Sequence, residues 1–223
     1  MTRPWQELDA VDTEEGRLLL LKRAESDFLI TVDGRVLMNS KANRSELVLA
    51  EEACKALSSH PAPRVLIGGL GMGCTLRAAL DNLPKNAKVQ VDELNPVVID
   101  WCKGPLKDLT ANAVSDPRVN VEITDVVKSI QKAAESKTKW DAIILDLYQG
   151  PTEAEAKTGK PFFGEAALAR THKALSKGGI FAVWGEDPDQ AFDRRLEKCG
   201  FTARSFRPKS GARRHTIWLA KKR

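Results

Sequence analysis

Short apolar runs alternate with stretches of helical periodicity along most of this 223-residue chain. The runs that predict buried strands cover residues 64–68, 88–92, 119–123, 140–145 and 180–183. Helical spacing predicts helices at residues 75–83, 96–102, 126–134, 165–175 and 189–199. Two last runs, which we expect to pair antiparallel, cover residues 201–206 and 215–220. Because strands that alternate with helices favour parallel crossovers, the pattern predicts an α/β fold with a doubly wound, mostly parallel, seven-stranded sheet.

The first forty residues follow a different pattern. Apolar runs occupy Arg17–Lys22, Phe28–Val32 and Val36–Met38. Asp33-Gly34, between the last two runs, is a strong signal for a tight hairpin turn. We therefore predict an N-terminal β-hairpin extension over residues 1–44 and a second domain over residues 45–223. Ser45 is predicted to cap a helix, because apolar residues recur at helical spacing after it.

Positive charge is concentrated at the end of the chain. The sequence has 35 Lys and Arg against 30 Asp and Glu, a formal net charge of +5. Residues 201–223 hold eight of these basic residues and no acidic one, which leaves 27 basic against 30 acidic residues elsewhere. Such an edge either binds nucleic acid or an anionic substrate, or is a solvated strand with a basic tail. Nucleic acid is therefore a possible partner, although no aromatic–basic motif supports it.

Other features bear on location and on metal binding. No apolar run approaches the roughly 20 residues that a membrane-spanning helix needs. The first residues lack the apolar stretch of a secretory signal. We therefore expect a cytoplasmic protein without a membrane partner. The four cysteines show no zinc-binding spacing and the three histidines lie far apart, so we expect reduced thiols and no metal site.

The first strand of the alternating region leads into a glycine-rich turn, Gly69-Leu70-Gly71-Met72-Gly73. Glycines permit positive φ and a close approach of a ligand to the backbone, and the following helix offers free N–H groups. The dinucleotide pattern G-x-G-x-x-G fails here, because Cys74 and Leu76 stand where its last glycine would fall. The remaining pattern, Gly-x-Gly-x-Gly, is typical of S-adenosylmethionine-dependent transferases. The alternative is a tight turn with close helix packing.

Carboxylates end the next two strands. Glu93 is placed to accept hydrogen bonds from ribose hydroxyls, and Asp92 competes for the same role. Asp125 is placed to accept from the amine of adenine, while Val126 donates its N–H to the ring. An N-cap without a ligand would look the same at Asp125.

Asp146 follows the apolar strand at residues 140–145. A carboxylate beside a buried wall has a raised pKa, or pairs with a cationic amine or sulfonium. Tyr148, the single tyrosine of the chain, is expected to position an acceptor molecule. Its alternative is an ordinary half-buried aromatic residue.

Several segments together carry a specific resemblance: Asp33-Gly34, 59–73, 93–96, 116–119, Thr124-Asp125 and Leu145-Asp146. Through them, residues 28–220 resemble the spermidine synthase-like branch of class I S-adenosylmethionine-dependent methyltransferases, whose fold is Rossmann-like. The resemblance implies that the glycine turn faces the methionine part of the ligand, Glu93 the ribose and Asp125 the adenine. The expected cofactor-binding residues are Gly69, Leu70, Gly71, Met72, Gly73, Glu93, Leu94, Asp125, Val126 and Asp146.

The chain also departs from the polyamine aminopropyltransferases of that branch. Their first loop reads Gly-Gly-Gly-Asp-Gly-Gly, whereas Gly71-Met72 interrupts that pattern here and the acidic residue is absent. Leu37 or Met38 stands where they carry a glutamine, and only Glu46 remains of their Tyr-His-Glu signature. Gln149 replaces the second aspartate of their catalytic loop. Because a polyamine carries several positive charges, the loss of acids argues against this acceptor.

We therefore expect a methyltransferase with S-adenosylmethionine as cofactor and a small-molecule acceptor, in which Asp146, Tyr148 and Glu46 are catalytic. One alternative is a polyamine aminopropyltransferase that uses decarboxylated S-adenosylmethionine. A second alternative is a non-catalytic nucleotide- or RNA-binding module. The acceptor pocket is expected at residues 38–48, 147–163 and 184–190, with Trp184 as a wall residue or a core residue. The resemblance also implies a homodimer.

Overall fold

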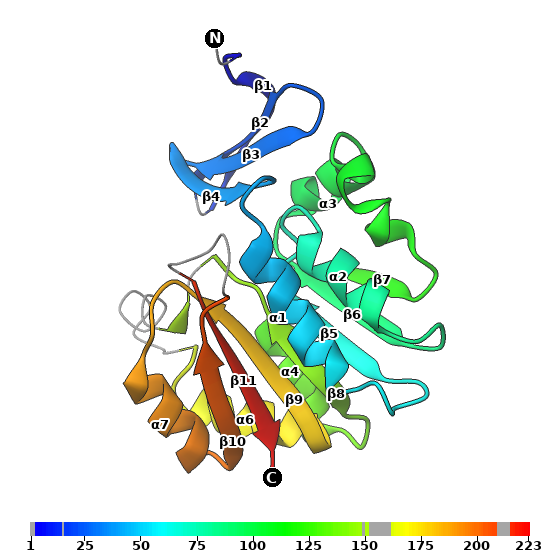
Figure 1. Ribbon diagram of the computed structural model, residues 1–223, viewed down its shortest axis with the longest axis vertical. Helices are drawn as coiled ribbons and strands as arrows, with labels where there is room; N and C mark the ends of the chain where they lie inside the picture. The colour runs from blue at the N-terminus through cyan, green and yellow to red at the C-terminus, as the bar shows by residue number, and fades with distance from the viewer. Residues whose placement is uncertain (1–2, 15, 149, 152–161, 209–214) are drawn as a thin grey trace.

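The computed structural model describes residues 3–14, 16–148, 150–151, 162–208 and 215–223. The chain forms two β-sheets, one of four strands and one of seven. Figure 1 shows the smaller, N-terminal sheet above the larger unit, with the C-terminus at the opposite end of the molecule. The division predicted between residues 44 and 45 falls between the last strand of the small sheet and the body of the first helix.

The small sheet is antiparallel, with the strand order β1-β2-β3-β4. Its strands are β1 (Gln6–Thr13), β2 (Gly16–Arg23), β3 (Asp27–Val32) and β4 (Arg35–Asn39). The predicted hairpin joins β3 and β4, and both turn residues have positive φ, 46° at Asp33 and 78° at Gly34. The sequence analysis missed β1, because most of its residues are exposed and its pairing with β2 rests on the backbone.

The large sheet has the strand order β10-β11-β9-β8-β5-β6-β7, which confirms the predicted fold class. Its strands are β5 (Arg64–Gly68), β6 (Lys88–Glu93), β7 (Val119–Ile123), β8 (Trp140–Leu145), β9 (Leu175–Gly185), β10 (Phe201–Phe206) and β11 (Thr216–Lys222). Strands β7, β6, β5, β8 and β9 are parallel, and β11 and β10 complete the sheet antiparallel. The strand order reverses between β5 and β8, which is where such sheets bind ligands.

Helices cover both faces of the large sheet and create two apolar cores. The helices are α1 (Arg44–Lys55), α2 (Cys74–Asn82), α3 (Pro96–Lys103), α4 (Val126–Glu135), α6 (Glu165–Ala174) and α7 (Gln190–Lys198), with 3-10 turns η1 (Lys107–Thr110) and η2 (Ala113–Ser115). Val65 and Ile67 of β5 enter the core under α1 and α2, whereas Leu66 enters the core under α4 and α6. This alternation follows from the period of two along a strand.

Two local predictions are wrong. Ser45 is not the N-cap of α1; Asn43 holds that position without a side-chain hydrogen bond, and the Ser45 hydroxyl has other partners. The predicted strand at residues 180–183 begins earlier, because Leu175 already pairs with Trp140. The register shift that follows accommodates Gly178, whose φ is 74°. The strand therefore begins with a bulge, and α6 ends at Ala174, one residue before the predicted helix end.

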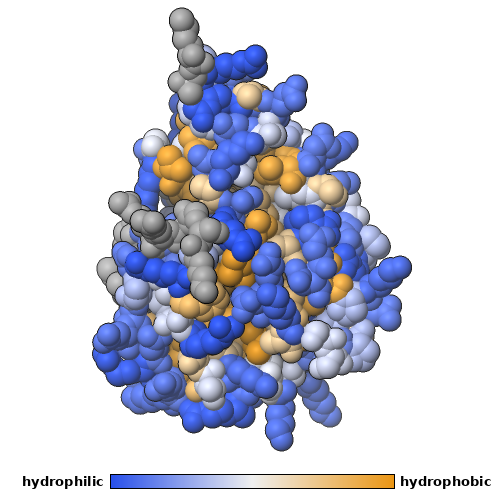
Figure 2. Space-filling view, viewed as in Figure 1, coloured by the Kyte–Doolittle hydropathy of each residue, from blue (hydrophilic) through white to orange (hydrophobic). Residues whose placement is uncertain are grey.

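The surface mixes polar and apolar areas. Figure 2 shows a mostly hydrophilic face on which apolar side chains gather in patches below the N-terminal sheet and along the middle of the molecule. Among the residues that the structure describes, no helix is long and apolar enough to cross a membrane.

Candidate active site

A cavity of about 620 Å³ opens at the carboxyl ends of β5, β6, β7 and β8. Its floor is the strand ends and the loops that follow them. The N-terminal sheet contributes an apolar wall of Leu18, Ile30, Leu37 and Met38. Phe162, Phe163 and helix α6 close the cavity on another side. The size and mostly apolar lining fit a ligand of nucleoside size.

The glycine turn borders this cavity through its backbone. Gly69 has φ of 88°, and a Cβ atom there would come within 2.5 Å of the carbonyl oxygen of Asp146. Gly71 has φ of 51°, and its own Cβ position is covered by the Met38 side chain. Positive φ at Gly69 and Gly71 favours glycine at both positions, and at Gly69 the close backbone contact leaves no room for a side chain. The predicted role of these glycines in the turn is therefore explained by the backbone. Leu70 and Met72 are buried and border a different, smaller cavity, and Gly73 is the N-cap of α2.

Glu93 ties the glycine turn to the end of β6. Its Oε2 accepts from the N–H of Leu70 at 2.9 Å and its Oε1 from the N–H of Asn95 at 2.9 Å. Each carboxylate oxygen keeps a further lone pair that a ribose hydroxyl can use. Asp92 also lines the cavity, with Oδ2 buried and without a hydrogen-bond partner among the described side chains and backbone. Burial raises the pKa of Asp92. Glu93 and Asp92 therefore both remain candidates for binding the ribose hydroxyls.

Asp125 and Val126 lie together at the next strand end. Asp125 is the N-cap of α4, and its Oδ1 accepts from the N–H of Val127 at 2.9 Å. Both residues line the large cavity, as does the half-exposed Leu94. The capping interpretation of Asp125 is therefore confirmed. It engages only one carboxylate oxygen, so the adenine contact stays a prediction.

Asp146 lies on the boundary between two cavities. It lines the large one and also a crevice of about 10 Å³, the small cavity, whose other acidic residue is Glu46. Thr75 donates a hydrogen bond to Oδ2 of Asp146 from the first turn of α2. Burial, and then repulsion by Glu46, raise the pKa of Asp146 to about 7. A carboxylate with this pKa can accept a proton near neutral pH.

Met38 is the second residue that lines both cavities. It reaches from β4 over Gly71, so Met38 and Asp146 lie between the two cavities. Glu46 lies in the first turn of α1. Tyr148 lines the large cavity, while Gln149 lies outside the described residues.

A polar group behind Glu46 was not anticipated. The Ser45 hydroxyl donates to Oε2 of Glu46 at 2.5 Å and lies 2.8 Å from Nδ1 of His215. Trp184 donates to the same hydroxyl at 3.2 Å and packs on the His215 ring, with centroids 4.7 Å apart. No local signal could have found this group, because Trp184 and His215 lie 139 and 170 positions from Ser45 in the chain.

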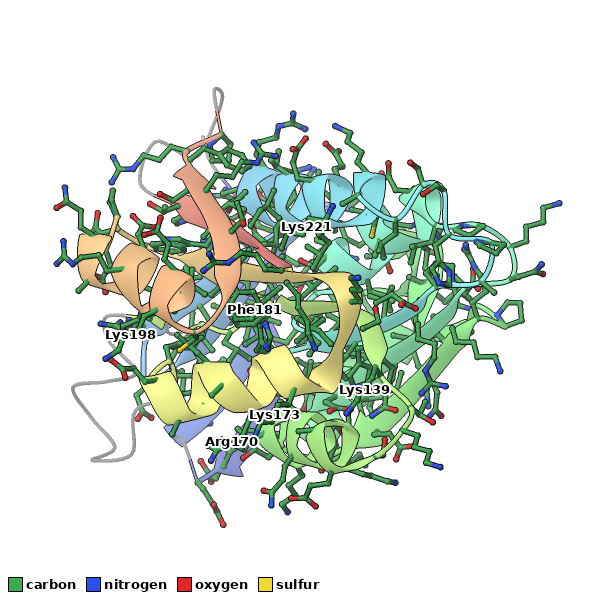
Figure 3. The ribbon with its side chains drawn as sticks, turned by 90° about the horizontal axis from the view of Figure 1, so that it is seen from below. Lys139, Arg170, Lys173, Phe181, Lys198 and Lys221 are labelled. Atoms are coloured by element: carbon green, nitrogen blue, oxygen red, sulfur yellow. The ribbon has the colours of Figure 1, made fainter. Side chains whose placement is uncertain are left out.

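The basic C-terminal edge is largely engaged in internal contacts. Arg204 pairs with Glu52 at 2.7 Å and Arg207 with Asp187 at 3.3 Å. The ammonium group of Lys222 donates to the carbonyl oxygens of His172 and Leu175. Figure 3 shows Lys221 at the end of β11, on the side of the molecule seen from below. Lys209, Arg213 and Arg214 lie outside the described residues. The contacts give the edge a structural role, and nucleic-acid binding stays an untested prediction.

Comparison with known proteins identifies similar sequences. The profile of the family described as "Spermine/spermidine synthase domain" matches residues 53–192. A polyamine aminopropyltransferase of Pyrobaculum calidifontis is 33% identical over 181 residues, which cover 79% of this chain and 56% of that protein. One of Clostridium tetani is 32% identical over 133 residues, which cover 59% of this chain and 44% of that protein. The chain thus spans about half the length of these curated relatives.

Solved structures share the fold. A spermidine synthase in complex with the transition state analogue AdoDATO matches with a TM-score of 0.75 at 24% identity, over 98% of this chain and 73% of that chain. The spermidine synthase from Thermotoga maritima matches with a TM-score of 0.73 at 24% identity, over the same shares of the two chains. At this identity the likeness concerns the arrangement of helices and strands.

These findings overturn the expected methyltransferase activity. The family profile and the named relatives support the alternative, a polyamine aminopropyltransferase. S-adenosylmethionine is withdrawn as the expected cofactor for the same reason. The glycine turn and the strand-end carboxylates predict a nucleoside ligand, but they do not specify which group is transferred from it.

The family match covers more than half of the chain, from the second half of α1 to the start of α7. It includes the glycine turn, Glu93, Asp125 and Asp146. The fold outside the match, including the N-terminal antiparallel sheet, also follows the solved spermidine synthase structures. The chain therefore belongs to the spermine/spermidine synthase domain family.

Proposed function

We propose that this chain transfers an aminopropyl group from decarboxylated S-adenosylmethionine to an amine. The observation that carries the proposal is the place of Asp146, which separates a cavity of nucleoside size from a small cavity with a second carboxylate. A donor in the large cavity and an amine whose ammonium end enters the small cavity would meet at this residue. The names of the relatives support the same chemistry.

The large cavity would bind the donor through the groups already described. The remaining lone pairs of Glu93 would accept from the ribose hydroxyls, and the buried Oδ2 of Asp92 offers a further acceptor. Asp125 and Val126 would face the adenine, and Leu94 would pack against it. The unpartnered Oδ2 of Asp92 is the feature that most clearly fits a ligand carrying hydroxyl groups.

The reaction would be an in-line displacement. The amine nitrogen attacks the propyl carbon bound to the sulfonium, a C–N bond forms, the C–S bond breaks, and its electron pair stays on sulfur in methylthioadenosine. The amine proton passes to Asp146, whose raised pKa of about 7 suits this role. Tyr148 would orient the substrates from the large cavity. Since the sulfonium is already a good leaving group, the protein mainly supplies alignment and a dry pocket.

The small cavity suits an acceptor with few positive charges better than a long polyamine. Glu46 and Asp146 are the two carboxylates of the small cavity, and Met72 contributes an apolar wall there. Two carboxylates suit an acceptor with one ammonium end near the reacting amine. The homodimer and the cytoplasmic location remain predictions that rest on the sequence.

Calorimetric titration with four ligands tests the donor. We expect decarboxylated S-adenosylmethionine and methylthioadenosine to bind at least about tenfold more tightly than S-adenosylmethionine and S-adenosylhomocysteine, because a buried carboxylate ligand would lie beside Asp146 and Glu46. Tighter binding of the two carboxylate-bearing ligands would contradict the proposal. Absence of binding by all four would contradict it as well.

A further inference from the structure

The Ser45 hydroxyl lies at the centre of a buried polar group assembled from three distant elements. Ser45 is the second residue of α1 and is fully buried. Trp184 comes from the end of β9, and His215 directly precedes β11. The antiparallel register pairs Ile217 with Trp184 and Thr216 with Gly185, so the sheet fixes the imidazole next to the indole. The group is therefore built by the fold and does not depend on a flexible side chain.

The protons of this group can be assigned from its chemistry. The hydroxyl has one proton, which it donates to Oε2 of Glu46 at 2.5 Å, since an ionised carboxylate can only accept. Its lone pairs accept from Nε1 of Trp184 at 3.2 Å and from Nδ1 of His215 at 2.8 Å. The imidazole must therefore carry its proton on Nδ1. Every hydrogen-bonding site of the hydroxyl is then used.

The arrangement does not serve to cap the helix. An N-cap hydroxyl accepts from backbone N–H groups of the first turn. The Ser45 hydroxyl instead accepts from two side chains of the sheet and donates to Glu46. Its effect is to fix the rotamer of Glu46, which lines the small cavity together with Asp146.

We propose that His215 and Trp184 act through Ser45 as positioning residues, holding the Glu46 carboxylate at the small cavity to bind the ammonium end of the acceptor amine. The assignment of an amine to this cavity rests on the proposed function. The fixed position of Glu46 does not, because it follows from hydrogen bonds within the chain.

The fixed carboxylate has a consequence in the absence of any substrate. The titratable groups that face Asp146 are Glu46 from α1 and Cys74 from α2, and Thr75 donates a hydrogen bond to it. Glu46 contributes to the raised pKa of Asp146 by repulsion. Freeing Glu46 from Ser45 would let its charge move toward solvent, and the pKa of Asp146 would fall.

Three variants and one control test the proposal. Ser45→Ala and His215→Leu remove the tether, whereas His215→Asn keeps a donor near the place of Nδ1. His60→Leu is the control, because His60 is a half-exposed histidine outside the small cavity. Thermal unfolding confirms that each variant is folded before it is compared.

The first measurement is the titration of the Asp146 carboxyl carbon by NMR in ligand-free protein. We expect a lower midpoint in Ser45→Ala and His215→Leu, and the wild-type midpoint in His215→Asn and His60→Leu. An unchanged midpoint in folded His215→Leu would overturn the proposal. If the midpoint in His215→Asn is as low as in His215→Leu, then His215 acts only by packing, and the proposal is overturned as well.

The second measurement is steady-state turnover with decarboxylated S-adenosylmethionine. We expect Ser45→Ala and His215→Leu to raise the KM for the amine about tenfold, with the affinity for methylthioadenosine unchanged. A loss of kcat alone, with KM unchanged, would contradict binding by Glu46. If the wild-type protein shows no turnover, the proposed function fails, and the NMR midpoints still decide whether Glu46 is held in place.

Discussion

Asp146 makes contacts at the candidate site through both its backbone and its carboxylate. Its N–H donates to the carbonyl oxygen of Gly68 at 3.0 Å, and its own carbonyl oxygen is the atom that a side chain at Gly69 would meet. Its carboxylate lies between the two cavities and accepts from Thr75. One residue therefore shapes the glycine turn and, in the proposed reaction, would accept the amine proton. Burial, and then the nearby charge of Glu46, make ionisation of this carboxyl group costly.

Replacing Asp146 by asparagine should stabilise the protein at high pH. The folded pKa of about 7 lies above the unfolded value of roughly 3.9, so the folded state binds more protons between these values. Wild-type stability therefore falls as pH rises through this window. Asparagine keeps the hydrogen bond from Thr75 but does not ionise. Between pH 5 and pH 8, Asp146→Asn should gain about 2 kcal/mol relative to wild type, as measured by urea unfolding.

The matched control is Asp108→Asn, which alters an exposed carboxylate on η1. Its stability relative to wild type should not change between the two pH values by more than about 0.5 kcal/mol. If the stability of Asp146→Asn relative to wild type changes as little between pH 5 and pH 8 as that of the control, then the pKa of Asp146 is not raised in the folded protein.

Gly69→Ala should be more destabilising than its positive φ alone explains. A Cβ at Gly69 would lie 2.5 Å from a backbone oxygen, whereas a Cβ at Gly34, with φ of 78°, meets no atom within 4 Å. We expect Gly34→Ala to cost about 1 kcal/mol, and Gly69→Ala about 3 kcal/mol together with loss of nucleoside binding. Denaturant unfolding of the two variants measures the difference, and equal costs would contradict the close contact.

At the level of elements, Glu93 connects three of them. It ends β6 and accepts from the turn after β5 and from the residue before α3. Gly69 adds a backbone contact, since its N–H donates to the carbonyl oxygen of Asp92 at 2.9 Å. The loops that would hold the donor are thus braced before any ligand binds. Such preorganisation lowers the entropy cost of binding.

Removing the Glu93 carboxylate should weaken methylthioadenosine binding by more than about tenfold, because ribose contacts and the bracing of the turn are both lost. Calorimetric titration of Glu93→Ala measures this loss. Glu122→Ala is the control: Glu122 is exposed on the neighbouring strand and accepts only from Asn120 in the described contacts. Unchanged affinity in Glu93→Ala would assign the ribose to Asp92 instead.

Turns and helix caps could be predicted from the sequence where they depend only on neighbouring residues. The Asp33-Gly34 turn requires positive φ, and the Asp125 cap needs only the following backbone N–H. The prediction failed at Ser45, because its hydroxyl bonds to His215 and Trp184 across the fold. A residue type that caps helices locally was used here in a tertiary contact, and such contacts leave no periodic trace.

At the scale of the whole molecule, the N-terminal sheet contributes side chains to the walls of both cavities of the candidate site. Met38 reaches from β4 over Gly71 and, with Asp146, separates the two cavities. Trp101 of α3 donates to Asp9 of β1 at 2.7 Å, which fixes the small sheet against the large unit. The small sheet therefore forms part of the candidate site.

Met38→Ala should join the two cavities and admit longer amines. We expect the KM for a triamine to fall about tenfold relative to that for a diamine, because the side chain that closes the small cavity is gone. Val36→Ala, an exposed residue of the same strand, serves as the control. Steady-state assays with both amines provide the comparison, and an unaltered preference would show that Met38 does not limit the acceptor.

The fold could be predicted, and strand-end residues that line the large cavity could be named, because strand ends carry their chemistry in consecutive residues. The transferred group could not, since Gly69, Glu93 and Asp125 address only the nucleoside part. The proposed acceptor side involves Met38, Glu46 and His215, which come from the N-terminal sheet, α1 and the residue before β11. Their proximity is set by the register and packing of whole sheets, which a sequence pattern does not reveal.

A turnover assay tests the central claim most directly. The purified chain is incubated with decarboxylated S-adenosylmethionine and a diamine, and the products are analysed by mass spectrometry. The account predicts equal amounts of methylthioadenosine and of the amine enlarged by one aminopropyl group, with at least about a hundredfold less product from Asp146→Asn. Formation of a methylated amine from S-adenosylmethionine, without any aminopropyl product, would contradict it.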